Sequence, residues 1–141
     1  MKYLLILPMA ILVLISCQSP ASEQSSANQE TKATQVDIQK PPFVDIDVAQ
    51  FKKMMSQPDV VLIDVRTPGE IADGKIEGAL EINIKDASFE QKIQELDKNK
   101  TYLVYCAAGV RSAKSCNKMA DLGFPKLYNL KGGYGAWNDA Q

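Results

Sequence analysis

The sequence predicts an α/β fold: a single domain in which a parallel β-sheet is covered by helices on both faces. Short apolar runs rich in β-branched residues alternate with segments whose apolar residues recur at helical spacing, a pattern typical of βαβ units. The chain has 141 residues, enough for one such domain, and its 45% hydrophobic and 23% charged residues can form a buried core. We find no internal repeat.

The first half of the domain is predicted to contain two helices and two strands. A helix follows Asp47 and runs to Met55, because its apolar residues lie three or four positions apart. Residues 60–65 are apolar, rich in β-branched side chains and bounded by prolines, as in a strand buried on both faces. Residues 80–84 alternate in polarity and predict a second strand, and the apolar face of residues 89–96 predicts the next helix.

The second half is predicted to contain two strands and a helix. Residues 101–105 and 126–130 are short apolar runs that predict strands, and residues 111–122 show helical periodicity between them. Gly123 is placed to end that helix in the left-handed conformation. Because ligands bind at the carboxyl ends of the strands in parallel sheets of this kind, a site is expected after a strand and before its helix.

Residues 1–16 are predicted to be a signal peptide, because Lys2 precedes an uncharged apolar run that ends at Ile15. A permanent membrane helix needs roughly 20 such residues, and this run is shorter. The segment Leu14-Ile15-Ser16-Cys17 resembles the lipobox of bacterial lipoproteins, which implies lipidation of Cys17 and a membrane anchor. An ordinary signal peptide with an incidental cysteine is the alternative.

The lipobox resemblance also implies export to the periplasmic side of the cell envelope. Gln18 after the cysteine indicates sorting to the outer membrane in a cell with two membranes. Residues 17–42 contain no aromatic side chain and are rich in Ser, Gln, Ala and Thr, which predicts a flexible tether behind the lipidated cysteine. The folded domain is expected to span residues 43–141.

Composition excludes two classes of function. The 16 basic residues nearly balance the 17 acidic ones, which leaves no broad positive field to attract nucleic acid. The chain has no histidine, which excludes Ser–His–Asp and Cys–His couples and imidazole metal ligands. Any chemistry therefore depends on cysteine, carboxylates, lysine, arginine, tyrosine or the backbone.

A cysteine follows the predicted strand 101–105 and opens the segment Cys106-Ala107-Ala108-Gly109-Val110-Arg111-Ser112. Small residues let consecutive backbone amides turn inward, and the N-terminus of the following helix adds partial positive charge. Both effects favour an anion and should lower the pKa of Cys106, and Arg111 adds a planar donor fork for an oxyanion. The segment predicts a nucleophilic thiolate, with an inert buried thiol as the alternative.

The pattern Cys-x-x-Gly-x-Arg-Ser after a strand resembles the active-site loop of the rhodanese, or sulfurtransferase, family. Residues 64–70 (Asp-Val-Arg-Thr-Pro-Gly-Glu) followed by residues 74–79 (Gly-Lys-Ile-Glu-Gly-Ala) are similar to the first signature of that family. Residues 130–133 (Leu-Lys-Gly-Gly) with Trp137 are similar to its C-terminal signature. The three landmarks occur in the expected order, so the chain is identified as a single-domain member.

The resemblance implies that Cys106 attacks a sulfane sulfur donor, becomes a persulfide and passes this sulfur to a nucleophilic acceptor. The substrate-binding residues would be those of the loop, whose amides cradle the sulfur: Ala107, Ala108, Gly109, Val110 and Arg111. The implied partners are a small donor such as thiosulfate and a thiol or cyanide acceptor, with a protein persulfide as a further donor or acceptor. The reaction requires no cofactor and no metal.

Supporting roles are expected of six further residues: Asp64, Arg66, Glu70, Ser112, Gly132 and Gly133. The charged ones would form salt bridges and hydrogen bonds around the site, with Arg66 and Glu70 four positions apart, and the glycines would permit a turn beside the loop. Cys116 shares a helix face with small residues and is predicted to be a buried structural thiol. A disulfide between Cys106 and Cys116, which would block sulfur transfer, stays open.

Other functions stay open. One is a persulfide carrier or partner-binding module that does not turn over small donors. Another is a phosphatase or arsenate reductase, but related phosphatases place five residues between cysteine and arginine, whereas Cys106 and Arg111 enclose four, and the tighter ring suits a sulfur atom. Thiosulfate is expected to be a weak donor, because members that prefer it often carry a basic residue inside the loop and residues 107–110 carry none.

Overall fold

The structure, a computed structural model, describes residues 41–141, which belong to a compact unit spanning residues 38–141. The predicted signal peptide (1–16), Cys17 and nearly all of the predicted tether (17–42) lie outside the described residues. Within residues 41–141, no helix has the length and apolar character needed to cross a membrane.

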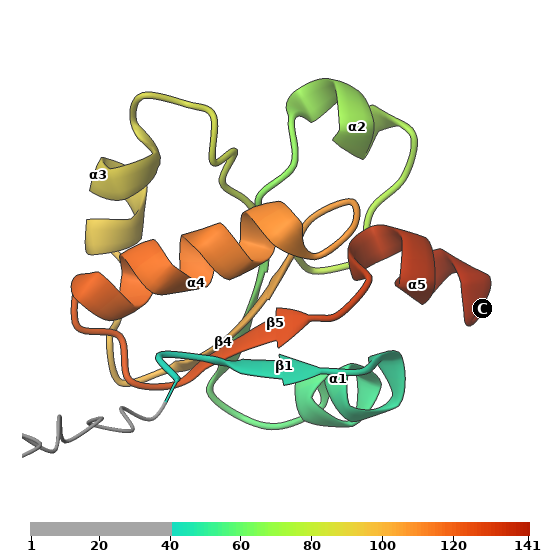
Figure 1. Cartoon of the computed structure of the whole chain (residues 1–141), viewed down its shortest axis with the longest axis horizontal. Coiled ribbons are helices and arrows are strands. Elements are labelled where there is room, and N and C mark those ends of the chain that lie inside the picture. Colours follow the sequence, from blue (N-terminus) through green and yellow to red (C-terminus); the bar gives the residue numbers. More distant parts are fainter. Residues whose placement is uncertain (1–40) are drawn as a thin grey trace, which may run out of the picture. The chain divides into compact units, whose positions relative to one another are not determined.

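Strands and helices alternate along the described part of the chain (Figure 1). In chain order they are β1 (Val44–Ile46), α1 (Val48–Met55), β2 (Val60–Asp64), α2 (Pro68–Ala72), β3 (Leu80–Glu81), α3 (Phe89–Gln94), β4 (Thr101–Tyr105), α4 (Val110–Asp121), β5 (Leu127–Leu130) and α5 (Gly133–Asp139).

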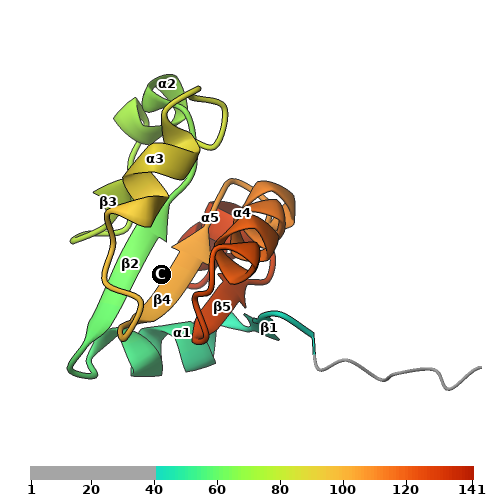
Figure 2. The same ribbon diagram turned by 90° about the vertical axis from the view of Figure 1, so that its left-hand side faces the viewer.

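The strands form one parallel sheet in the order β1-β5-β4-β2-β3, which confirms the predicted α/β class. The register of β2 and β4 runs from Val60 opposite Thr101 to Asp64 opposite Tyr105. Figure 2 shows β2, β4 and β5 side by side and pointing the same way. Because β4 is the middle strand, the residue that follows it emerges at the centre of the carboxyl edge of the sheet.

Helices cover both faces of the sheet, as the sequence predicts. One core cluster includes Met119 of α4, and the other includes Phe51 of α1 with Trp137 of α5 packed against it. Successive strand residues point to opposite faces, so Val104 joins the first cluster and Leu103 the second. Figure 1 shows α4 and α1 on opposite sides of the strands. Burial of each such side chain contributes about 1.5–3 kcal/mol relative to exposure.

Three elements are absent from the sequence-based prediction because they are too short for a periodic pattern to reveal. β1 has 3 residues, α2 has 5, and α5 has 7 and begins in a glycine pair. A fourth element, β3, covers only Leu80–Glu81 of the predicted strand 80–84. Each of these elements depends on tertiary pairing, as β1 does on its parallel contact with β5.

α4 matches its prediction to within one residue at each end. It begins after Gly109, whose φ of 91° is left-handed, and it ends before Gly123, whose φ is 88°. The Gly123 amide donates to the Ala120 carbonyl over 2.8 Å and the Phe124 amide to the Met119 carbonyl over 3.1 Å. These are the two hydrogen bonds of a Schellman motif, so the predicted glycine cap is confirmed.

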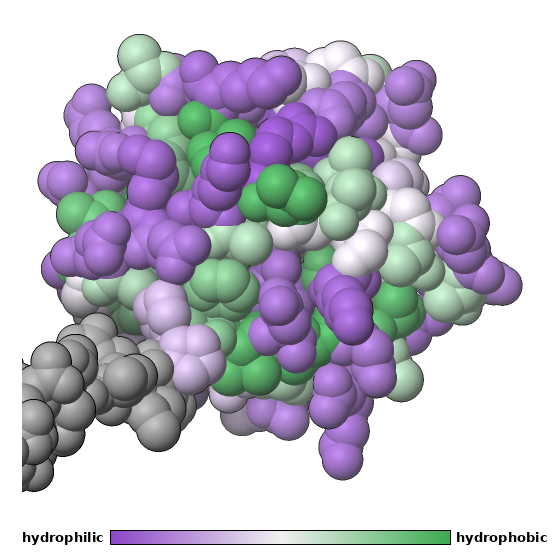
Figure 3. Space-filling view, in the orientation of Figure 1, coloured by the Kyte–Doolittle hydropathy of each residue, from purple (hydrophilic) through white to green (hydrophobic). Residues whose placement is uncertain are grey.

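Hydrophilic residues break up the apolar surface on the face shown in Figure 3. The exposed large hydrophobic residues of the described part are Val44, Leu80 and Val110, with 42%, 45% and 65% of their surface accessible. Val110, the most accessible of the three, is the first residue of α4, directly after the turn that follows β4.

Candidate active site

Cys106 follows the last residue of β4, at the position where the sequence predicted a ligand site. The chain then turns sharply so that α4 starts at Val110, and the left-handed Gly109 makes this turn possible. A Cβ atom at Gly109 would lie 3.1 Å from the Leu130 carbonyl oxygen and 3.2 Å from the Gly132 nitrogen. The loop therefore packs closely against the end of β5.

The thiol of Cys106 is held by hydrogen-bond donors of its own loop. The Gly109 amide donates to Sγ over 3.1 Å, and the Ser112 hydroxyl lies 3.4 Å from Sγ. Burial raises the pKa of Cys106, but hydrogen bonds from the Ser112 hydroxyl and from the amides of Ser112, Ala108 and Gly109 outweigh it, so the pKa is lowered overall. The loop thus stabilises the thiolate without a titrating base.

The thiol lies at the floor of the loop. Only 1% of Cys106 is accessible, whereas Ala107, Ala108 and Val110 are exposed and form an uncharged rim. The predicted substrate-binding residues lie in this turn and in the first two residues of α4, where Arg111 is half-buried.

Arg111 is already engaged by a carboxylate. Its Nη1 donates to Glu70 Oε2 over 2.8 Å and its Nη2 donates to Glu70 Oε1. Glu70 belongs to α2, 41 residues earlier in the chain. Hydrogen bonds from Arg111 and then from Thr67 hold the pKa of Glu70 far below its usual range. Arg66, four positions before Glu70, makes its hydrogen bond to Glu70 at the backbone carbonyl and not at the carboxylate.

Arg66 is instead paired with Asp64. Arg66 Nη2 lies 2.7 Å from Asp64 Oδ2, and the two side chains are 3% and 0% exposed. The guanidinium also donates to the backbone carbonyls of Glu70 and Gly74, over 3.2 and 2.8 Å, and lies 4.2 Å from the ring centre of Tyr134. Arg66 therefore ties α2 and the following turn to β2.

The N-terminus of α5 is bonded to the cysteine loop. The Tyr134 amide donates to the Cys106 carbonyl over 2.7 Å and the Gly135 amide to the Ala107 carbonyl over 3.0 Å. A Cβ atom at Gly133 would lie 2.3 Å from the Cys106 carbonyl oxygen, a distance that side chains do not tolerate. Gly132 and Gly133 thus do more than turn the chain, because they let a helix end meet the loop backbone. Figure 1 shows the loop between α2 and α5.

Asn129 of β5 links the loop to the edge strand. Its side-chain nitrogen donates to Asp45 Oδ1 over 2.7 Å and to the Gly109 carbonyl over 3.2 Å. Both partners are acceptors, which requires the amide nitrogen to face them. Asn129 Oδ1 is consequently buried without a hydrogen-bond partner among the described residues. A buried oxygen without a partner costs stability, and the two hydrogen bonds that the Asn129 nitrogen donates offset that cost.

Cys116 is a free thiol on the core face of α4, with none of its surface exposed. Burial raises its pKa to about 12. Cys106 is also free, so in this structure the two thiols are not joined. Within residues 41–141, no group of three or more cysteine and acidic side chains is placed to hold a metal ion.

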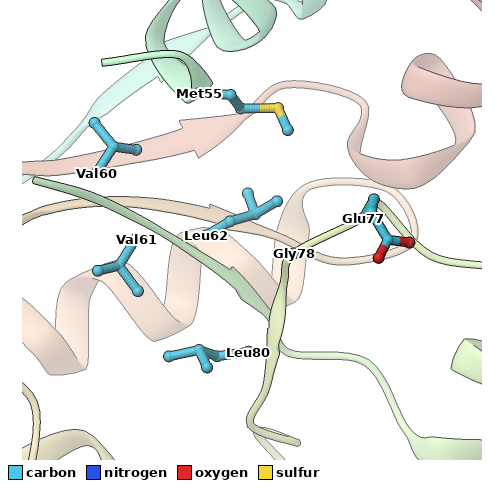
Figure 4. A pocket seen from close by; sticks show the side chains of 7 residues that line it. All are labelled: Met55, Val60, Val61, Leu62, Glu77, Gly78 and Leu80. Atoms are coloured by element: carbon cyan, nitrogen blue, oxygen red, sulfur yellow. The ribbon is translucent and has the colours of Figure 1, made fainter. Parts of the chain in front are cut away.

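A separate hollow of about 380 Å³ lies at the edge of the sheet, between α1, the start of β2 and the turn before β3 (Figure 4). Its lining residues are Met55, Val60, Val61, Leu62, Glu77, Gly78 and Leu80. None of them belongs to the cysteine loop, so this hollow is distinct from the candidate active site.

Sequence reasoning did not single out Thr67, Asn129 or Tyr134. The sequence signal for Thr67 is the Thr-x-x-Glu spacing of a capping box, which the structure shows with Glu70. Asn129 and Tyr134 contact the loop only through tertiary packing, and no local pattern in the sequence marks them.

Comparison with known proteins matches residues 47–140 to the Rhodanese-like domain family. A curated relative, a sulfurtransferase from Allochromatium vinosum, is 34% identical over 86 residues, which cover 61% of this chain and 78% of that protein. A rhodanese-like domain protein from Staphylococcus aureus has a similar solved structure, with a TM-score of 0.60 and 33% identity over 67% of this chain and 90% of that one.

Other relatives are larger proteins. A tRNA uridine(34) hydroxylase from Cytophaga hutchinsonii is 36% identical over 91 residues, which are 62% of this chain but 29% of that protein. The chain thus spans less than a third of the length of this relative.

Proposed function

The chain belongs to the rhodanese-like family, and we propose that it is a sulfurtransferase that carries a sulfane sulfur on Cys106. The general class, a sulfurtransferase-type protein that takes sulfur from a donor and gives it to a thiol acceptor, is supported by its sulfurtransferase relatives. The finer proposal is the route of the sulfur through a Cys106 persulfide.

The observation that carries this proposal is the set of donors around the Cys106 sulfur. The Gly109 amide donates to Sγ, the Ser112 hydroxyl lies 3.4 Å from it, and the loop lowers the pKa of the thiol. A terminal persulfide sulfur is anionic at neutral pH, so the donors that stabilise the thiolate also suit the intermediate. The loop has to admit one more sulfur atom between its amides and its uncharged rim.

With thiosulfate as donor, the Cys106 thiolate attacks the outer sulfur, the S–S bond of thiosulfate breaks, and sulfite leaves with the electron pair. A cyanide or thiolate acceptor then attacks the outer sulfur of the persulfide, and the Cys106 thiolate is the leaving group. Each step exchanges one bond for another, so no oxidant, metal or cofactor takes part.

The test is a single-turnover and steady-state assay of the purified protein with thiosulfate and cyanide. We expect a gain of one sulfur atom on Cys106 by mass spectrometry and formation of thiocyanate, and we expect Cys106→Ser to abolish both. Sulfur gain without thiocyanate would favour the carrier function instead. Loss of neither signal in Cys106→Ser would refute the assigned nucleophile.

We further propose that the protein is exported and held by a lipid on Cys17 on the periplasmic side of the envelope, at the outer membrane. The supporting observations are the basic start, the apolar run and the lipobox-like residues 14–17. Metabolic labelling with an alkyne fatty acid should mark the wild-type chain in the membrane fraction. Cys17→Ala should remove the label, and a Cys17→Ala chain that stays labelled would contradict the proposal.

A further inference from the structure

Arg111 is the charged side chain of the cysteine loop, and Glu70 fills its donor fork. Two parallel hydrogen bonds join Nη1 and Nη2 to the two carboxylate oxygens. An oxyanion donor would use the same planar fork in the same bidentate manner. Glu70 therefore occupies the place that the sulfonate end of thiosulfate would take on Arg111.

Glu70 is held independently of Arg111. Its Oε2 accepts hydrogen bonds from the Thr67 hydroxyl over 2.7 Å and from the Thr67 amide over 3.1 Å, in the capping box that starts α2. These bonds, together with that from Arg111, keep the carboxyl group ionised at any physiological pH. A fixed negative charge therefore faces the loop from α2.

Apart from Arg111, the groups around Glu70 supply no free positive charge. Ala107, Ala108 and Val110 form an exposed, uncharged rim. Arg66, which contacts the Glu70 carbonyl, is 3% exposed and is neutralised by Asp64. A donor that approaches the thiolate therefore meets an Arg111 whose charge and donors are already used.

We propose that Glu70 is a specificity-determining residue that disfavours multiply charged oxyanion donors by occupying the Arg111 fork. The site then takes its sulfur from donors of low charge, such as a persulfide carried on an organic or protein thiol. This inference rests on the proposed sulfurtransferase function. To bind Arg111, a dianionic donor has to displace the Glu70 carboxylate from the guanidinium, and it then lies close to that negative charge. A persulfide R–S–SH does not need the donor fork of Arg111.

The step with a persulfide donor balances without a further reactant. The Cys106 thiolate attacks the outer sulfur of R–S–SH, a new S–S bond forms on Cys106, and the S–S bond of the donor breaks. The thiolate RS⁻ leaves with the electron pair, and the proton remains on the transferred sulfur until solvent removes it.

The test compares two donors that differ by one charge in wild type and Glu70→Gln, with cyanide as acceptor. Thiosulfate carries two negative charges and methanethiosulfonate one, and each gives up its sulfur to a thiolate with an oxidised sulfur anion as leaving group. Glutamine keeps the size of the side chain, the capping box and one oxygen for Arg111. The repulsion between the fixed charge of Glu70 and a donor is proportional to the charge of the donor. In Glu70→Gln, kcat/KM should therefore rise about tenfold for thiosulfate and about threefold for methanethiosulfonate.

Glu90→Gln is the matched control. It also removes one negative charge and one ion pair, that with Lys118 on α4, and neither residue lies in the cysteine loop. It should leave both kcat/KM values within twofold.

The outcomes separate this inference from the proposed function. Turnover with an unchanged donor preference in Glu70→Gln, or an equal gain for both donors, would overturn the role of Glu70 alone. Absence of both thiocyanate and sulfur on Cys106 in every variant and with every donor, the persulfide of glutathione included, would overturn the sulfurtransferase function itself.

Discussion

Cys106 lies just before α4 and Cys116 lies within it, and this difference in position determines the reactivity of each thiol. Both are almost completely buried. Cys106 lies where the backbone amides that precede α4 have no partner in the helix, so its sulfur receives hydrogen bonds. Cys116 lies further along α4 among apolar side chains, where burial first, and then the negative charge of Asp45, raises its pKa to about 12.

This contrast predicts selective alkylation. At pH 7.5 iodoacetamide should modify Cys106 at least about 100-fold faster than Cys116, because the thiolate is the reacting species. Ser112→Ala should slow the modification of Cys106 at that pH about threefold to tenfold, since the hydroxyl makes the largest favourable contribution to the lowered pKa. Peptide mapping after timed quenching measures both rates.

Ser115→Ala is the control for that change. Ser115 is equally buried on the same helix, but its hydroxyl donates to the Arg111 carbonyl and not to the thiol. It should leave the rate for Cys106 unchanged, and a similar slowing in both variants would contradict the role given to Ser112.

Asn129 carries a second prediction at the scale of one residue. Asn129→Leu removes the bonds to Asp45 and to the Gly109 carbonyl, so the loop loses its link to β1. Stability should fall by about 1–3 kcal/mol, and the alkylation rate of Cys106 at neutral pH should also fall as Gly109 moves. Chemical denaturation and alkylation measure the two effects. Asn138→Leu, at an exposed position, is the control. Unchanged reactivity of Cys106 in Asn129→Leu would show that Asn129 contributes to stability but does not position the loop.

At the scale of elements, the site depends on three segments meeting at the carboxyl edge of the sheet. The β4–α4 loop supplies the thiol, α2 supplies Glu70, and α5 supplies the amides that bond to the Cys106 and Ala107 carbonyls. Because the amides of α5 satisfy the carbonyls of Cys106 and Ala107, the loop backbone is held with its own amides free to donate to the sulfur.

The contact between α5 and the loop predicts a sharp difference between two neighbouring glycines. Gly133→Ala places a Cβ atom 2.3 Å from the Cys106 carbonyl oxygen at a residue with φ of 60°, so it should cost about 2 kcal/mol or more and reduce turnover at least tenfold. Gly135→Ala meets only an ordinary contact at 3.5 Å and should be neutral or stabilising by about 0.5 kcal/mol. Thermal unfolding and thiocyanate formation test both, and similar behaviour of the two variants would refute the close approach.

At the scale of the whole molecule, the buried thiol of Cys116 makes stability depend on pH. Above pH 9 the unfolded chain ionises this cysteine, while the folded chain keeps it protonated up to a pKa of about 12. The contribution of Cys116 to the free energy of unfolding is therefore fully present below pH 9. It is lost as pH rises from 9 towards 12, with a slope of about 1.4 kcal/mol per pH unit.

Denaturant unfolding at pH 8, 9, 10 and 11 tests this dependence. Cys116→Ala should lose about that much slope above pH 9, although it is less stable at pH 8 because of the small cavity that it leaves. Cys106→Ala should retain the slope. Parallel pH profiles for wild type and Cys116→Ala would show that Cys116 is accessible to solvent in the folded protein.

The sequence by itself determined the parallel α/β class, the helices with clear periodicity and the position of Cys106 between a strand and a helix. These features depend on local patterns: the alternation of apolar runs with amphipathic segments, and small residues leading into a helix start. α4 and its glycine cap were therefore predicted to within a residue.

Only the tertiary structure decided which residues meet at the thiol. Glu70 and Arg66 are four positions apart, but α2 is oriented so that the carboxylate of Glu70 faces Arg111, 41 residues away, while Arg66 points at Asp64. β1, α2 and α5 are too short to produce a periodic signal and form because the sheet and the cysteine loop offer them partners. Such contacts depend on the free energy of the assembled fold, which a local stretch of sequence does not contain.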